Sequence, residues 1–215
     1  MKYSIPLTNT LYLSNLNSYL ILATDNIATF ERQNDDFIKK IINKEAGPNL
    51  HEEGSHLNNI DWLFLNSLFV TMYASFEHFL MKVASTLEWQ PKIDIKLHHM
   101  SGRGILEQYT NYLHLVGGLS TANREIHPWG RISHYQNVRN LLAHNGGVMM
   151  DSIDKPLTKH KDFKFLQQEQ VVMAGSHGLI RIKSIKILNS FMSDTALLTN
   201  NLVKEFNKKY DVKDK

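Results

Sequence analysis

The chain has 215 residues, of which 42% are hydrophobic and 21% are charged, and its formal net charge is +3. This balance is typical of a soluble globular protein that can bury a core, and it is far less basic than that of histone-like nucleic-acid binders. There is no cysteine, which excludes disulfides, thiolate catalysis and cysteine-ligated zinc.

The first ten residues, MKYSIPLTNT, lack the basic and apolar regions of a signal peptide. The longest apolar stretch without charge, residues 62–76, contains polar side chains. It is also shorter than the roughly 20 residues that span a bilayer. We therefore expect a cytoplasmic protein without a membrane segment.

Helical periodicity predominates in the first half of the chain. Residues 8–43 contain no Gly or Pro and carry apolar residues three and four apart, which predicts one long helix or two helices with a kink. Gly47-Pro48 predicts a polar loop that extends through Gly54. The next helix is expected over 58–87, capped by Asn58 or Asn59. Its middle is apolar nearly all the way round, as in the central helix of a bundle.

The second half predicts further helices and one small hairpin. We expect a shorter helix over 104–115 and a helix from His127-Pro128 to Asn145-Gly146-Gly147. A polar loop over 150–168 and a β-hairpin over 170–182 follow, and a last amphipathic helix covers 184–210. Together these elements predict one all-α domain over residues 1–215 with a minor hairpin.

The most informative motif is Arg139-Asn140-Leu141-Leu142-Ala143-His144-Asn145, at the end of the predicted helix. Asn140 and His144 are four residues apart, so both can act on one ligand, while Tyr135, Val138 and Leu142 should face the core. The helix dipole also favours a cation in the last turn, where His144 stands.

Arg139 lies about 140° from His144 on the helical wheel, beside apolar residues. A partly desolvated guanidinium needs a carboxylate or phosphate partner. Glu77 stands alone among apolar residues in the middle of the preceding long helix. We therefore expect Glu77 to pair with Arg139 and to hold its guanidinium in one orientation.

Residues outside this motif suggest, more weakly, a metal site or further contacts to a ligand. A metal site could involve histidines outside the motif, namely His51, His56, His98, His99, His127 and His134. None has the spacing of a helical zinc pair, so we expect neither a metal nor a cofactor. Arg103 and Arg131 are candidates for RNA contacts, or are ordinary surface residues.

The string Arg-Asn-x-x-Ala-His at a helix end resembles the HEPN superfamily (higher eukaryotes and prokaryotes nucleotide-binding domains). The hallmark of that family is Arg, four to six residues, then His, often with Asn after the Arg, and Arg139 to His144 fit the four-residue spacing. The resemblance covers about residues 58–147, which would form the core that bears the motif. The hairpin and the last helix, residues 170–210, would be additions to this core. It implies an antiparallel helical bundle with long N- and C-terminal helices.

The resemblance implies a metal-independent endoribonuclease that acts as a toxin, in abortive infection or in another anti-phage defence. In such enzymes the motifs of two subunits form one composite site, so we expect a homodimer, an RNA substrate and an antitoxin or defence-system partner protein. His144 would act as acid or base, Arg139 would bind the phosphate, and Asn140 would position substrate or imidazole. Glu77 and Asn145 would support them. The products expected are 2′,3′-cyclic phosphate and 5′-hydroxyl ends.

Two other interpretations remain open. The chain could be a catalytically silent HEPN-like module that binds RNA, nucleotide or a protein partner. It could also be a helical interaction bundle unrelated to that family, in which case the motif is accidental.

Overall fold

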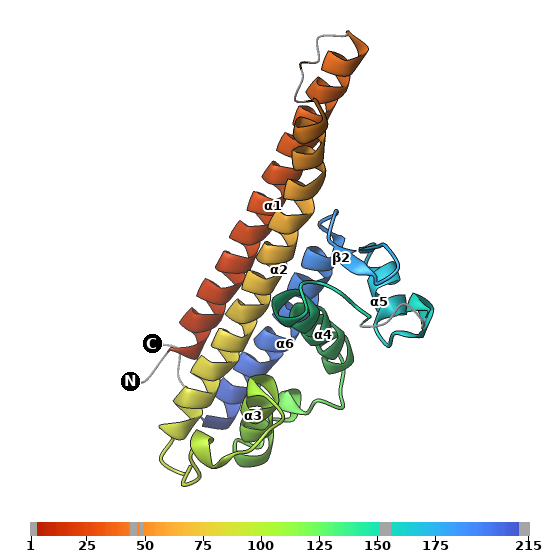
Figure 1. Cartoon of the computed structure of the whole chain (residues 1–215). Helices are drawn as coiled ribbons and strands as arrows, with labels where there is room; N and C mark the ends of the chain where they lie inside the picture. Colours follow the sequence, from red (N-terminus) through yellow and green to blue (C-terminus); the bar gives the residue numbers. More distant parts are fainter. Residues whose placement is uncertain (1–3, 44–46, 48–49, 151–155, 211–215) are drawn as a thin grey trace. The chain divides into compact units, whose positions relative to one another are not determined.

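The computed structural model describes residues 4–43, 47, 50–150 and 156–210. Its helices are α1 (Ile5–Ile42), α2 (Leu50–Glu88), α3 (Ile105–Asn111), α4 (Trp129–His144), α5 (Phe163–Gln168) and α6 (Lys186–Tyr210) (Figure 1). A two-stranded antiparallel sheet pairs β1 (Val172–Ala174) with β2 (Leu179–Arg181). The predicted all-α fold with a small hairpin is therefore confirmed. None of the described helices combines the length and the apolarity that crossing a membrane requires.

The long helices differ from the sequence prediction at one end. The stretch from residue 8 to 42 lies within one helix, α1, but α2 begins at Leu50. The predicted loop through Gly54 and the cap at Asn58 or Asn59 are therefore wrong. Gly54 instead makes room for a neighbour, because a Cβ there would lie 3.1 Å from the ring of Phe37 on α1. This glycine permits close helix packing and does not break the helix.

The helix predicted over 104–115 is α3 followed by a π-helical segment, η2 (Tyr112–Val116). The N–H of Gly117 donates to the carbonyl of Tyr112 and closes that wider turn. A Cβ on Gly117 would lie 2.6 Å from the carbonyl oxygen of Leu113 and 2.7 Å from the side chain of Leu87, so only glycine fits there. The predicted polar loop over 150–168 also contains α5, which buries Phe165 and Leu166.

The described residues form two compact units, and α1, α2, α4 and α6 contribute to both. The first comprises Met1–Leu16, Met72–Gln136 and Phe191–Lys215, and the second comprises Asn17–Thr71 and Asn137–Ser190. The expectation of one domain over residues 1–215 stays a prediction.

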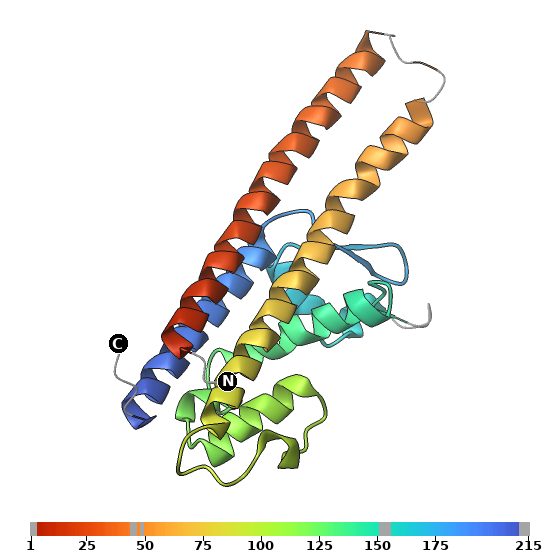
Figure 2. The same cartoon turned by 90° about the vertical axis from the view of Figure 1, so that its left-hand side faces the viewer.

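Aromatic side chains fill the core of the first unit. The ring of Phe76 on α2 lies 6.3 Å from Tyr12 of α1, 6.3 Å from Trp129 of α4 and 6.2 Å from Phe191 of α6. Each such pair contributes about 0.5–1.5 kcal/mol beyond the area it buries. The hydroxyl of Tyr12 donates to Thr195 on α6 at 2.8 Å, which joins the N-terminal part of α1 to α6. Figure 2 shows the ribbon of this part of α1 beside that of α6.

In the second unit, β2 is bonded along both of its edges. One edge pairs with β1. On the other edge, the N–H of Ile180 donates to the carbonyl of Gly147 at 2.9 Å. The amide of Asn66 on α2 completes this edge: its Nδ2 donates to the carbonyl of Ile180 at 3.0 Å, and its Oδ1 accepts from the N–H of Ile182 at 3.0 Å. Asn66 thus replaces the backbone of a third strand.

Candidate functional site

The end of α4 is fixed in place by backbone hydrogen bonds. The carbonyl of Leu141 accepts from the N–H groups of Asn145 at 3.0 Å and Gly147 at 2.8 Å. Gly147 has a φ of +80°, a value that glycine adopts readily. Because Gly147 also binds Ile180 of β2, the helix end that carries His144 is attached to the hairpin.

The faces of α4 are arranged largely as the sequence predicts. Tyr135 and Val138 are fully buried, whereas Leu142 is half-buried. Asn140 is half-buried and His144 is exposed. The imidazole of His144 is therefore accessible to a ligand from solvent.

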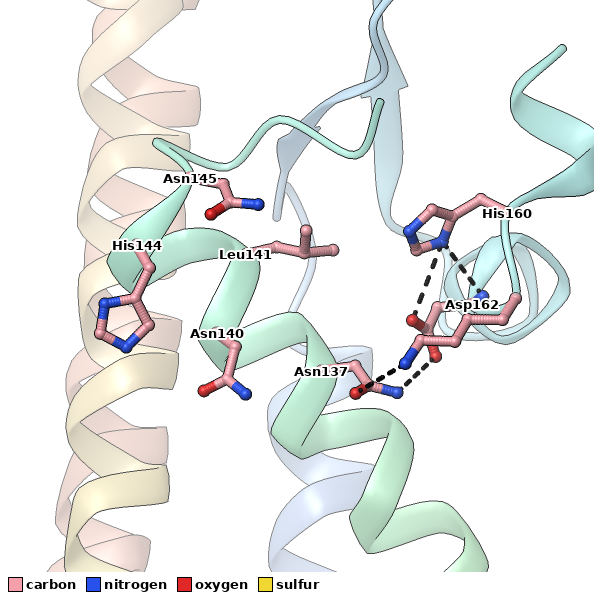
Figure 3. Close-up of a pocket in the computed structure, with 8 residues that line it drawn as sticks. Asn137, Asn140, Leu141, His144, Asn145, His160 and Asp162 are labelled. Atoms are coloured by element: carbon pink, nitrogen blue, oxygen red, sulfur yellow. Dashed lines mark hydrogen bonds and ion pairs between the residues drawn. The ribbon is translucent and has the colours of Figure 1, made fainter. Parts of the chain in front are cut away.

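A pocket of about 350 Å³ opens beside the polar face of α4, within the second unit (Figure 3). Small-ligand sites range from about 300 to 1,000 Å³, so this pocket is at the small end of that range. Its lining residues are Asn137, Asn140, Leu141, His144, Asn145, His160, Lys161 and Asp162. Of the predicted site residues, the structure thus brings Asn140, His144 and Asn145 together.

The loop before α5 supplies the remaining lining residues. The carboxylate of Asp162 is fully buried, and its Oδ1 accepts from Nδ2 of Asn137 at 3.1 Å. Nδ1 of His160 accepts from the backbone N–H of Asp162 at 3.2 Å and lies 3.8 Å from Oδ2 of the same residue. Lys161 donates through Nζ to Oδ1 of Asn137 at 3.2 Å. Asn137 therefore bridges an ammonium and a carboxylate.

Sequence reasoning did not find His160, Lys161 and Asp162. They are adjacent polar residues in a stretch expected to be loop. Three adjacent titratable residues directly before a short apolar run are the only sign of a site in this stretch of the sequence. Their distance from His144 along the chain does not indicate that the two segments lie near one another. Only the tertiary fold of the second unit places them opposite α4.

Neither Arg139 nor Glu77 lines this pocket. Arg139 is half-buried and is not among the lining residues. Glu77 belongs to the first unit and Arg139 to the second, and their ion pair stays a prediction. Within the first unit, burial and then the negative charge of Glu77 raise the pKa of Tyr109.

The two arginines predicted to contact RNA both belong to the first unit. Arg131 donates through Nε to Oδ2 of Asp194 at 2.7 Å and through a terminal nitrogen to the hydroxyl of Tyr135 at 2.9 Å. That hydroxyl donates to the same carboxylate at 2.8 Å, so these bonds hold α4 to α6. Arg103 is exposed, and its backbone N–H donates to Glu107 at 2.8 Å. RNA contact by either residue stays a prediction.

The histidines considered for a metal do not gather in the described part of the chain. No group of three His, Asp or Glu side chains among the described residues is placed to hold a metal ion. His98 and His99 lie ring against ring, with centroids 4.1 Å apart. The side chains of His51 and His56 are outside the described residues.

The groups around the pocket can transfer protons and bind an anion. The lining residues include two histidines, one lysine and three asparagines, and a buried carboxylate lies behind the imidazole of His160. Figure 3 shows the imidazole of His144 turned away from that of His160, on the other side of Leu141. Imidazoles exchange protons near neutral pH, and an ammonium attracts phosphate. Comparison of the chain with protein-family models, with curated proteins and with solved structures finds no significant match.

Proposed function

We propose that this protein is a metal-independent endoribonuclease and that the pocket beside His144 is its active site. The observation that carries the proposal is the position of His144. Its exposed imidazole ends α4 and, with the amide of Asn140 one turn earlier, lines a pocket of about 350 Å³. This is the helix end that resembles the HEPN motif.

The chemistry needs groups of these types. A base removes the proton from the 2′-hydroxyl, the bond from O2′ to phosphorus forms, and the bond from phosphorus to O5′ breaks. An acid gives a proton to the leaving O5′, which yields a 2′,3′-cyclic phosphate and a 5′-hydroxyl. His144 is the base or the acid, and Asn140 positions it or the substrate. Arg139 stabilises the charge on the phosphate, which requires its guanidinium to reach the substrate.

The reaction requires a second proton-transfer group. In the arrangement that the resemblance implies, this is His144 of the partner subunit in a homodimer. The exposure of His144 is compatible with that arrangement, since a second copy can reach it. Activity that rises with the square of the protein concentration at high dilution would support a composite site.

The direct test is incubation of the purified protein with RNA in excess EDTA. We expect cleavage by the wild type and a loss of about 100-fold or more for His144→Ala, because general acid–base catalysis contributes roughly 10²–10⁴-fold. His78→Ala is the matched control, since it removes another exposed helical histidine. Unchanged cleavage by His144→Ala, or cleavage abolished by EDTA, would contradict the proposal.

The cellular part of the proposal is that this ribonuclease acts as a toxin or anti-phage effector that a partner protein restrains. Induced expression should then arrest growth for the wild type and for His78→Ala, but not for His144→Ala. Equal arrest by a folded His144→Ala protein would instead indicate the silent module that acts by binding RNA, nucleotide or a protein.

A further inference from the structure

We propose that three lysines, Lys159, Lys161 and Lys164, bind the phosphate backbone of single-stranded RNA where the strand leaves the pocket. We call them the lysine segment. This inference rests on the proposed ribonuclease function, because it names the surface that would hold the substrate of that reaction. It assigns RNA contact to residues outside the Arg-Asn-x-x-Ala-His motif and different from Arg103 and Arg131.

The part of the second unit that follows α4 has a surface of one charge sign. Its described residues are 145–150 and 156–190. Among them the two acidic residues are shielded from solvent, since Asp162 is 0% exposed and Glu169 is 3% exposed. The exposed Asp, Glu, Lys or Arg side chains of the same residues are all lysines, namely Lys159, Lys161, Lys164, Lys183 and Lys186. Such a surface attracts a polyanion.

The lysine segment keeps its positive charge available to a ligand. Among the described residues, no carboxylate lies within ion-pair distance of Lys159, Lys161 or Lys164. Lys161 donates through Nζ to Oδ1 of Asn137 at 3.2 Å, but this acceptor is neutral and leaves the charge uncompensated. Nζ of Lys183, by contrast, lies 3.8 Å from a carboxylate oxygen on α2. The inference is therefore confined to the lysine segment.

The lysine segment is continuous with the pocket. Lys161 lines the pocket itself, and Lys159 and Lys164 stand on either side of it in the chain. Because a chain advances at most about 3.3–3.6 Å per residue, their Cα atoms lie within about 7 Å and about 11 Å of that of Lys161. A strand held in the pocket by one phosphate thus brings its neighbouring phosphates to these ammonium groups.

The composition of this surface favours a nucleic-acid strand over a protein partner. Among described residues 145–150 and 156–190, Val172 alone is a large hydrophobic residue with strong exposure. The centre of a protein–protein interface is poor in lysine and rich in aromatic and other apolar side chains. Contacts between lysine and phosphate need no such apolar centre. We therefore commit to RNA as the occupant.

The test measures binding of a fluorescent, fully 2′-O-methylated RNA oligonucleotide by anisotropy at several salt concentrations. This RNA lacks the 2′-hydroxyl that the reaction needs, so binding is measured apart from cleavage. The double variant Lys159→Gln/Lys164→Gln removes two charges and leaves the lining residue Lys161 in place. The matched control is Lys204→Gln/Lys208→Gln, because it removes two exposed lysine charges from α6.

The expected effect follows from the release of counterions. Each phosphate contact on a single strand adds about 0.7 to the slope of log affinity against log salt, or about fivefold in affinity at about 0.1 M salt. We expect Lys159→Gln/Lys164→Gln to bind about 25-fold more weakly there, with a slope smaller by about 1.4. The control pair should match the wild type. Lys159→Arg/Lys164→Arg keeps both charges and should bind within about threefold of the wild type.

The outcomes separate this inference from the ribonuclease proposal. An unchanged salt slope, or an equal loss for the control pair, would overturn the inference and leave the ribonuclease proposal intact. Poly-L-glutamate that binds the lysine segment as tightly as the RNA would also overturn it, since an acidic protein would then be the partner. A wild type that binds the oligonucleotide through these lysines but does not cleave ordinary RNA would overturn the ribonuclease proposal and leave the binding surface.

Discussion

Replacement of Asn66 provides a test of how the hairpin is attached to α2. The side chain is 8% exposed, and its amide binds the carbonyl of Ile180 and the N–H of Ile182, both at 3.0 Å. In Asn66→Leu the side chain keeps its approximate size but both backbone groups lose their partner. A buried polar group left without a hydrogen bond costs about 1–3 kcal/mol. Two such groups predict a loss of about 2–6 kcal/mol.

The assay is urea unfolding followed by circular dichroism, with the free energy of unfolding extrapolated to water. The matched control is Ser67→Ala, since Ser67 is the exposed neighbour of Asn66 and its hydroxyl donates to the carbonyl of Leu63 within α2. A surface change of this kind should stay within about 0.5 kcal/mol. If Asn66→Leu costs no more than Ser67→Ala, the amide does not act as a third strand.

Three further changes test other parts of the structure. The Glu205 carboxylate accepts from the N–H groups of Ser120 and Thr121, and although burial raises its pKa, these bonds lower it overall. Its charged form therefore stabilises the fold above about pH 4.5 and stops doing so as the pH falls through the folded pKa. Glu205→Gln should cost about 1 kcal/mol at pH 7, and this difference should vanish in acid; a difference that is constant with pH would refute the assignment. Tyr12→Phe removes a buried hydrogen bond of 2.8 Å and should cost about 1 kcal/mol in thermal unfolding, whereas no change would mean that this bond is not formed. Gly146 has a φ of +59°, so Gly146→Ala should cost about 1 kcal/mol and Gly146→Asn less; equal costs would argue against a left-handed residue at this helix end.

The sequence predicts the helices well because their apolar residues repeat at helical spacing and their ends are marked by Gly and Pro. It also predicts the hairpin, whose two apolar runs flank Gly175 and Gly178. The start of α2 was missed because Gly54 looks like a loop residue, while its actual role is to admit the ring of Phe37. That role depends on a contact between two helices, which no local pattern encodes.

In the candidate site too, local spacing predicts some residues, whereas others depend on tertiary contacts. Asn140, His144 and Asn145 were found because they share one helix end, where spacing determines proximity. His160 and Asp162 were not found, since their place opposite α4 depends on how the chain returns after residue 155. The bond from Asn137 on α4 to Asp162 depends on the same return of the chain, so helical spacing alone does not predict it.

The most direct test of the site is the NMR spectrum of the histidine rings during titration with a fully 2′-O-methylated RNA oligonucleotide. This probe keeps the phosphates and bases but has no free 2′-hydroxyl, so it binds without being cleaved. We predict that the ring resonances of His144 and His160 shift in a saturable manner, while those of His177, outside the pocket, do not. Binding of the oligonucleotide with His144 and His160 unshifted would contradict the assignment of the active site.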